Sequence, residues 1–245
     1  VRPHLGRDFV MTSWLTPPPV PVEWWDLNEA SGTRVAAITT PGNDLTDNNT
    51  VTQAVGIPIG GNAAQFTDAT SEYLSLADNA DLSLGADVSF TWTAWAYLDS
   101  LPANSMTILS KSNGSGVGTE YIFAHNNVEN RFSIFINNGV SGITLYATAF
   151  GALSTGVWYF VAAWHDALAN TLNIQVNNGT INSDVWANGT QDTANIFVMG
   201  ALNSDPSPVQ FWNGRIDKPA LWKSVLTAGN RTWLYNNGNG RPRPY

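Results

Sequence analysis

Seven Asn-Gly dipeptides divide this sequence into short segments, and they limit the possible folds more than any other feature. They begin at positions 113, 138, 178, 188, 213, 237 and 239. Both residues accept positive φ, so the pair favours a tight hairpin turn. Runs rich in β-branched and aromatic residues lie between several of them, at 88–98, 131–136, 143–148, 157–165, 172–176 and 196–199. This pattern predicts antiparallel strands and an all-β fold.

One helix is predicted near the end of the sequence. Residues 228–235 follow Thr227, a good N-cap, and precede Gly238, a residue that commonly ends helices. Many short strands with one short C-terminal helix are typical of a two-sheet antiparallel β-sandwich of the jelly-roll type. The length of 245 residues suits one such domain.

The first 21 residues differ from the rest, because four prolines between positions 17 and 21 fix φ and exclude this segment from the centre of a sheet. We therefore predict an extended N-terminal arm over residues 1–21 and a sandwich domain over residues 22–245. We expect the arm to bind a neighbouring subunit through its apolar side chains, which are Phe9, Met11, Trp14 and Leu15.

Charge excludes one class of partner. The formal net charge is −8, whereas binding along nucleic acid needs a basic face, so we expect no nucleic-acid partner. Four of the eleven cations lie at the two ends, which are therefore basic on an acidic body; these are Arg2, Arg7, Arg241 and Arg243. These ends are expected to dock on acidic surface, either their own or a neighbour's. No run of about 18 apolar residues occurs, so we expect no membrane partner.

Aromatic residues occupy both faces of two predicted strands. Trp95 and Tyr97 share one face of 88–98, and Phe160 and Trp164 share one face of 157–165. The opposite face of 88–98, with Phe90 and Trp92, is also apolar. One face must be core, so the other is either a surface that stacks on sugar rings or one that the arm or a loop covers. Trp95, Tyr97, Phe160 and Trp164 are therefore the candidate ligand-binding residues.

A series of short motifs resembles the laminin-G-like, concanavalin A-like jelly-roll family from about residue 22 to the end. The motifs, in order, are Trp24-Trp25-Asp26-Leu27, Glu72-Tyr73-Leu74-Ser75-Leu76, Phe90-Thr91-Trp92-Thr93-Ala94-Trp95, Ile108-Leu109-Ser110-Lys111, Gly156-Val157-Trp158-Tyr159 and Gly214-Arg215-Ile216-Asp217. The resemblance implies two antiparallel sheets and a mostly non-catalytic module that binds glycans, cell surfaces or other proteins.

The resemblance also points to a metal position. Many family members hold one structural Ca²⁺ at the sheet rim, and Asp217 matches the recurrent aspartate. Calcium needs six to eight oxygen ligands, and the cation of Lys218 opposes it. Either Asp217 binds calcium or it accepts backbone N–H groups and holds a loop.

No catalytic pattern is present, so we predict that the protein is not an enzyme. None of the five glutamates has Asp two residues later, as the paired carboxylates of this fold's glycosidases require. A Gly-x-Ser-x-Gly elbow and a His-x-x-x-His pair are also absent.

Three functional predictions remain, but the scarcity of Glu and His disfavours the third, a lyase or hydrolase with unrecognised residues, and leaves two. The first is a bacteriophage virion surface component, a capsid decoration or tail adhesion protein whose arm contacts neighbouring subunits and whose surface contacts host glycans. It agrees with the lack of cysteine and of a signal-peptide pattern. The alternative is a secreted or cell-surface bacterial lectin-like module that binds carbohydrate.

Overall fold

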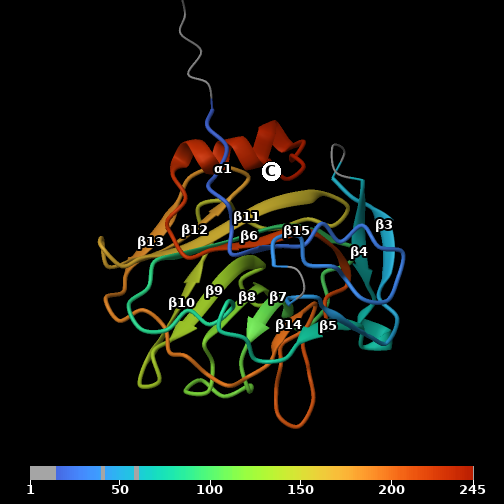
Figure 1. Ribbon diagram of the computed structural model, residues 1–245, viewed down its shortest axis with the longest axis horizontal. Helices are drawn as coiled ribbons and strands as arrows, with labels where there is room; N and C mark the ends of the chain where they lie inside the picture. Colours follow the sequence, from blue (N-terminus) through green and yellow to red (C-terminus); the bar gives the residue numbers. More distant parts are fainter. Residues whose placement is uncertain (1–14, 40–41, 58–60, 245) are drawn as a thin grey trace, which may run out of the picture.

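Two stacked antiparallel sheets form a β-sandwich in the computed structural model, which describes residues 15–39, 42–57 and 61–244 (Figure 1). The eight-stranded sheet contains, in spatial order, β13 (Asn182–Val185), β12 (Thr171–Val176), β11 (Trp158–Asp166), β6 (Phe90–Leu98), β15 (Gly214–Trp222), β4 (Asn62–Phe66) and β3 (Thr52–Val55), with β1 (Glu23–Trp24) paired to β15. The seven-stranded sheet contains β10 (Gly142–Tyr146), β9 (Arg131–Asn137), β8 (Tyr121–Asn126), β7 (Met106–Lys111), β14 (Phe197–Met199), β5 (Tyr73–Leu76) and β2 (Thr46–Asn48). The predicted fold class is confirmed.

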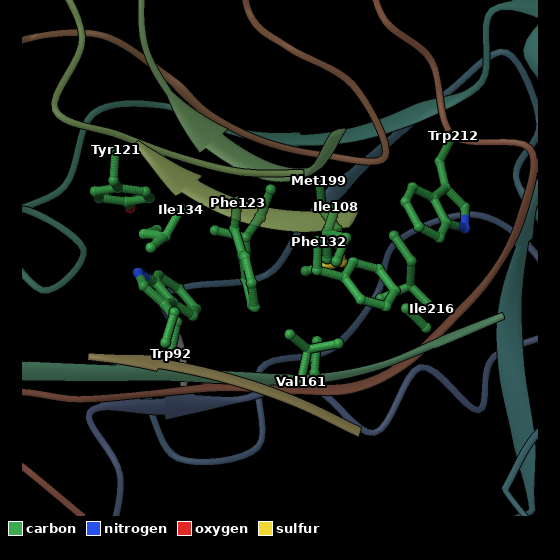
Figure 2. Packing of buried hydrophobic residues seen from close by; sticks show 14 of the residues in the cluster. Trp92, Ile108, Tyr121, Phe123, Phe132, Ile134, Val161, Met199, Trp212 and Ile216 are labelled. Atoms are coloured by element: carbon green, nitrogen blue, oxygen red, sulfur yellow. The ribbon is translucent and has the colours of Figure 1, made fainter. Parts of the chain in front are cut away.

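The main core fills the space between the two sheets. Alternation along β6 sends Phe90 and Trp92 inward, and Val161 of β11 points the same way. Side chains of the second sheet, including Phe123 and Ile134, meet them there (Figure 2). The ring of Trp92 stacks on that of Phe197, with centroids 5.8 Å apart. The inward face of the strand at 88–98 is therefore core, as the alternation indicated.

The helix α1 (Ala228–Tyr235) lies across the outer face of the eight-stranded sheet (Figure 1). It begins as predicted, because Thr227 accepts a hydrogen bond from the Asn230 N–H and the Asn230 side chain accepts one from the Thr227 N–H. It spans the predicted residues 228–235, and the residue that caps its C-terminus in the left-handed conformation is Asn236 (φ 47°) and not Gly238. Two short 3₁₀ turns are η1 (Asp68–Thr70) and η2 (Asn236–Gly238). No helix in the described part of the chain is long and apolar enough to span a membrane.

Both ends of the described chain lie on this same sheet. Carbonyl groups of the arm accept hydrogen bonds from Trp222 Nε1 (2.8 Å) and Asn230 Nδ2 (3.1 and 3.2 Å). At the other end Arg243 Nε lies 3.0 Å from Asp26 Oδ2, and Arg241 covers the Trp233 ring. The C-terminal basic end thus docks on the chain's own acidic surface, one of the two alternatives that the charge pattern left open.

The predicted arm is therefore not separate from the sandwich over residues 15–21. Leu15 is exposed. The other apolar residues of the arm lie outside the described residues, so their contact with a neighbouring subunit stays a prediction; they are Phe9, Met11 and Trp14.

Candidate functional site

The predicted aromatic surface is covered by the C-terminal helix. Trp95, Phe160 and Trp164 are 3%, 3% and 5% exposed. The Tyr235 ring lies nearly parallel to that of Trp95, with centroids 6.0 Å apart. The Arg231 guanidinium lies 4.1 Å above the Trp164 ring, a cation–π contact. The prediction that these three rings form an open stacking surface is wrong, because α1 fills the place that a sugar would take.

Tyr97, the fourth predicted ligand residue, is half-buried beyond the end of this cover. Its ring makes a tilted pair with Trp158, with centroids 5.4 Å apart. The Arg215 guanidinium lies 4.5 Å from the Tyr97 centroid. Protein groups therefore contact this ring on two sides, and it is a poor platform for a ligand.

Asp217 lies at a bulge in β15, where the pairing register shifts before Ala220. It is fully buried, and Lys218 Nζ lies 3.0 and 3.1 Å from its two carboxylate oxygens. The Ile57 N–H donates to Oδ2 over 3.0 Å. Burial raises the pKa of Asp217 from 3.8 to about 6, and the Lys218 charge and the two hydrogen bonds offset this only in part.

These surroundings do not fit the calcium ion that the family resemblance implied. Both oxygens of Asp217 already face the ammonium group of its own neighbour. No cluster of three or more acidic or histidine side chains that could hold a metal occurs among the described residues. A divalent cation prefers several oxygen ligands, and here it would meet a buried positive charge. The alternative, in which Asp217 holds a loop through N–H groups, agrees with the Ile57 contact.

A second buried charge, Lys111, joins three loops at one end of the sandwich. Its Nζ lies 2.9 Å from Glu120 Oε2 and 2.9 Å from Asp78 Oδ1, and it donates to Ser83 Oγ over 3.1 Å. Burial raises the pKa of Glu120, although the hydrogen bond from Lys111 opposes this. Every donor position of the ammonium group has an acceptor, so the cluster stabilises loops and offers no free nucleophile.

An open cavity of about 510 Å³ lies near η1. We call it the rim cavity. Its lining comes from four separate parts of the chain: Asp68 of η1, the segment 102–106 before β7, Asn127 after β8, and 209–211 before β15. Four loops converge there because antiparallel strands end at common edges of a sandwich. No local motif brings these residues together, so no sequence pattern pointed to them.

Several polar side chains of the rim cavity are already held by protein partners. Ser105 Oγ donates to Asn127 Oδ1 over 2.9 Å, and Asn127 Nδ2 donates to the Ala103 carbonyl. Gln210 Oε1 accepts from Thr107 Oγ1 at 3.3 Å. These bonds fix the walls of the cavity.

Three polar groups of the cavity remain without a hydrogen-bond partner in the described part of the chain: the Asp68 carboxylate, the Asn104 amide and Nε2 of Gln210. Asp68 is positioned by its own turn, because Glu72 accepts hydrogen bonds from the Thr67 N–H (2.8 Å) and from Thr70 Oγ1 (2.7 Å). The cavity thus presents acceptors and donors on a fixed frame.

An aromatic ring completes the rim cavity. Phe211 is half-buried, and its ring packs against that of Tyr73 with centroids 6.3 Å apart. Met106, at the start of β7, adds apolar lining. An apolar wall beside a few convergent polar groups is typical of small-molecule and glycan sites.

Comparison with known proteins supports the fold and identifies the family. The family model described as the concanavalin A-like lectin/glucanases superfamily, Laminin_G_3, matches residues 68–230. The chain belongs to this family. No curated protein sequence matches the chain.

Several solved structures share the sandwich of this concanavalin A-like domain. Domain 4 of AbnA, an extracellular arabinanase from Geobacillus stearothermophilus in complex with arabinotriose, is 14% identical with a TM-score of 0.62, over 89% of this chain and 98% of that one. The receptor-binding domain of botulinum neurotoxin D is 13% identical with a TM-score of 0.62, over 89% of this chain and 52% of that one, so this chain spans about half its length. A heptameric SAP-like pentraxin from Limulus polyphemus is 16% identical with a TM-score of 0.50, over 70% and 84%. At these identities the likeness shows the fold alone.

Proposed function

We propose that this domain binds carbohydrate in the rim cavity. The observation that carries the proposal is the set of unpaired polar groups beside an aromatic ring. Asp68, Asn104 and Gln210 offer acceptors and donors, and Phe211 offers an apolar face. Sugars combine hydroxyl groups at their edges with apolar C–H faces, so they complement such a site.

Family membership supports the same ligand class. Domain 4 of the arabinanase has been crystallised with arabinotriose, and this chain matches nearly all of that domain in fold. Fold alone does not decide function, and the likeness to that domain shows only a shared sandwich. The proposal stands on the cavity of this chain.

The proposal is binding without turnover. Hydrolysis of a glycosidic bond usually needs two carboxyl groups, about 5 Å apart in retaining enzymes and roughly 6.5–9.5 Å apart in inverting enzymes. Asp68 is the only carboxylate in the described lining of the cavity. The domain would therefore hold a glycan while another protein or domain acts on it.

A glycan panel followed by calorimetry tests the proposal. Phe211→Ala should weaken the best ligand by about fivefold, since an aromatic contact contributes about 1 kcal/mol beyond buried area. Asp68→Asn should weaken it by roughly 10- to 100-fold, because hydrogen bonds to a charged group contribute about 1.5–3 kcal/mol. Asp205→Asn is the matched control, because Asp205 is exposed and lines a different cavity of about 450 Å³. Equal affinities for all variants would refute the site.

The location of the domain, on a virion or on a bacterial surface, is a separate proposal. A bacteriophage virion surface is the placement expected from the sequence, with a secreted or cell-surface bacterial module as the alternative. The first depends on contacts of residues 1–14, outside the described part of the chain. Native mass measurement distinguishes the two, because a large assembly lost on deletion of residues 1–14 supports the virion placement, and a 26.5 kDa monomer supports the alternative.

A further inference from the structure

We infer that the rim cavity selects neutral sugars and rejects anionic ones such as uronic and sialic acids. The inference rests on the proposed function and adds the chemical class of the ligand. Asp68 is the only charged side chain among the lining residues. The remaining polar lining consists of amides and a hydroxyl group, which carry no charge.

Recognition of an acidic sugar usually requires a cation, because a carboxylate buried against protein needs a charged or multiple donor partner. The sequence contains eleven Lys and Arg residues, of which Arg2 and Arg7 lie outside the described residues. Each of the nine others has a position away from the cavity lining. Four are buried within the sandwich or under α1; these are Arg34, Lys111, Lys218 and Arg231.

The exposed or half-exposed cations are engaged elsewhere. Arg215 packs on Tyr97, Arg241 packs on Trp233, and Arg243 pairs with Asp26. Lys223 Nζ donates to the Ala80 carbonyl over 2.8 Å. None of these four cations lines the rim cavity.

Arg131 and Arg215 each lie four residues along the chain from a lining residue, and Arg131 begins β9 just after the turn that contains Asn127. Arg131 Nη1 donates to the carbonyls of Glu129 and Asn130, at 3.1 and 3.0 Å. His125 pairs with Met106 in the sheet, but it is buried, and burial lowers its pKa and so disfavours the charged form. Neither group places a positive charge in the cavity lining.

The Asp68 carboxylate therefore meets its ligand without a neutralising partner. A carboxylate accepts hydrogen bonds and donates none, so it favours hydroxyl groups, and two neighbouring hydroxyls can bind its two oxygens. A carboxylate on the ligand would instead face a like charge at close range. The opposing charges should reduce affinity by about tenfold or more at low salt.

Matched pairs of a neutral and an acidic glycan test the inference. The probes are cellohexaose with its β-1,4-glucuronate counterpart, mannohexaose with β-1,4-mannuronate hexamer, and lactose with sialyllactose. We expect the neutral member of at least one pair to bind about tenfold or more tightly than its acidic partner in 20 mM salt. In Asp68→Asn the two members should approach equal affinity, and in wild type the difference should shrink in 500 mM salt.

The possible failures are distinguishable. Acidic glycans that bind as tightly as neutral ones, with binding lost in Phe211→Ala, would overturn the inference and leave the proposed function intact. Loss of that acidic binding in Arg131→Ala would identify the cation responsible. No binding by any member of any pair, or by a wider panel, would overturn the proposed function and the inference together.

Discussion

Raising the pH from 4 to 7 should weaken the folded state through one carboxyl group, Asp217. This side chain is fully buried at the bulge in β15, and its pKa is about 6 in the folded protein against 3.8 ordinarily. Between these two values the folded protein keeps the proton while the unfolded chain releases it. The folded state therefore binds more protons, and the free energy of unfolding falls as the pH rises through this window.

The size of the effect follows from the two pKa values. They differ by roughly 2 units, and each unit corresponds to about 1.4 kcal/mol. The contribution of Asp217 to the free energy of unfolding should fall by on the order of 3 kcal/mol between pH 4 and pH 7. Lys218 reduces this loss but does not cancel it, because burial is the larger influence on the carboxyl group.

Urea unfolding at pH 4, 5, 6 and 7, followed by tryptophan fluorescence, measures the change. The comparison is between wild type and Asp217→Asn, which cannot titrate. Burial also raises the pKa of Glu120 and lowers that of His125, but both variants share these groups, so they cancel in the difference. The difference between the two stabilities should shift by on the order of 3 kcal/mol in favour of Asn as the pH rises. Parallel curves would refute the reasoning, and a shift of opposite sign would show that the Lys218 charge outweighs burial.

Three further outcomes are expected. Excess EDTA should change the melting temperature by less than about 1 °C, because Lys218 already faces both oxygens of Asp217; a loss of several degrees would show a bound metal. Gly56→Ala should destabilise the fold by roughly 1–3 kcal/mol in urea unfolding, because the added Cβ would lie 2.6 Å from Asp217 Oδ2; unchanged stability would contradict this packing. Thr227→Ala should cost about 0.5–2 kcal/mol through loss of the helix cap, and an unaltered melt would show that α1 does not depend on it.

The fold was predictable because its signals are local. Alternation over 88–98 and 157–165 gave β6 and β11 to within two residues, and Thr227 marked the start of α1. The last residue of the helix was also predicted, and only the capping residue differs, since Asn236 and not Gly238 follows it in the left-handed conformation. Asn tolerates positive φ nearly as well as Gly does, so an Asn-Asn-Gly sequence offers several stopping points.

The rim cavity was not predictable by the same means. Consecutive members of the set Asp68, Asn104, Asn127 and Gln210 are 23 to 83 residues apart along the chain, and each looks like an ordinary loop residue in the sequence. What distinguishes Asp68, Asn104 and Gln210 is that each keeps a polar group without a partner in the described part of the chain after folding. That property depends on how four loops pack at one end of the sandwich, and no periodic pattern in the sequence predicts it.

The prediction of an open aromatic surface was wrong for a different reason. The sequence did contain the information that this surface is covered. A strand with two apolar faces requires a cover on its second face. A helix of eight residues is not stable in water alone and requires an apolar surface to pack on. The predicted helix carries Leu234 and Tyr235, and the predicted sheet carries Trp95 and Phe160. The sheet supplies the apolar surface that the helix requires, and the helix covers the second apolar face of the sheet. Their packing buries all four side chains wholly or in part. With the helix packed on that face, the face is closed to a ligand. A polar ligand must then bind where backbone and side-chain polar groups stay unpaired, which is at the loop ends and at Asp68.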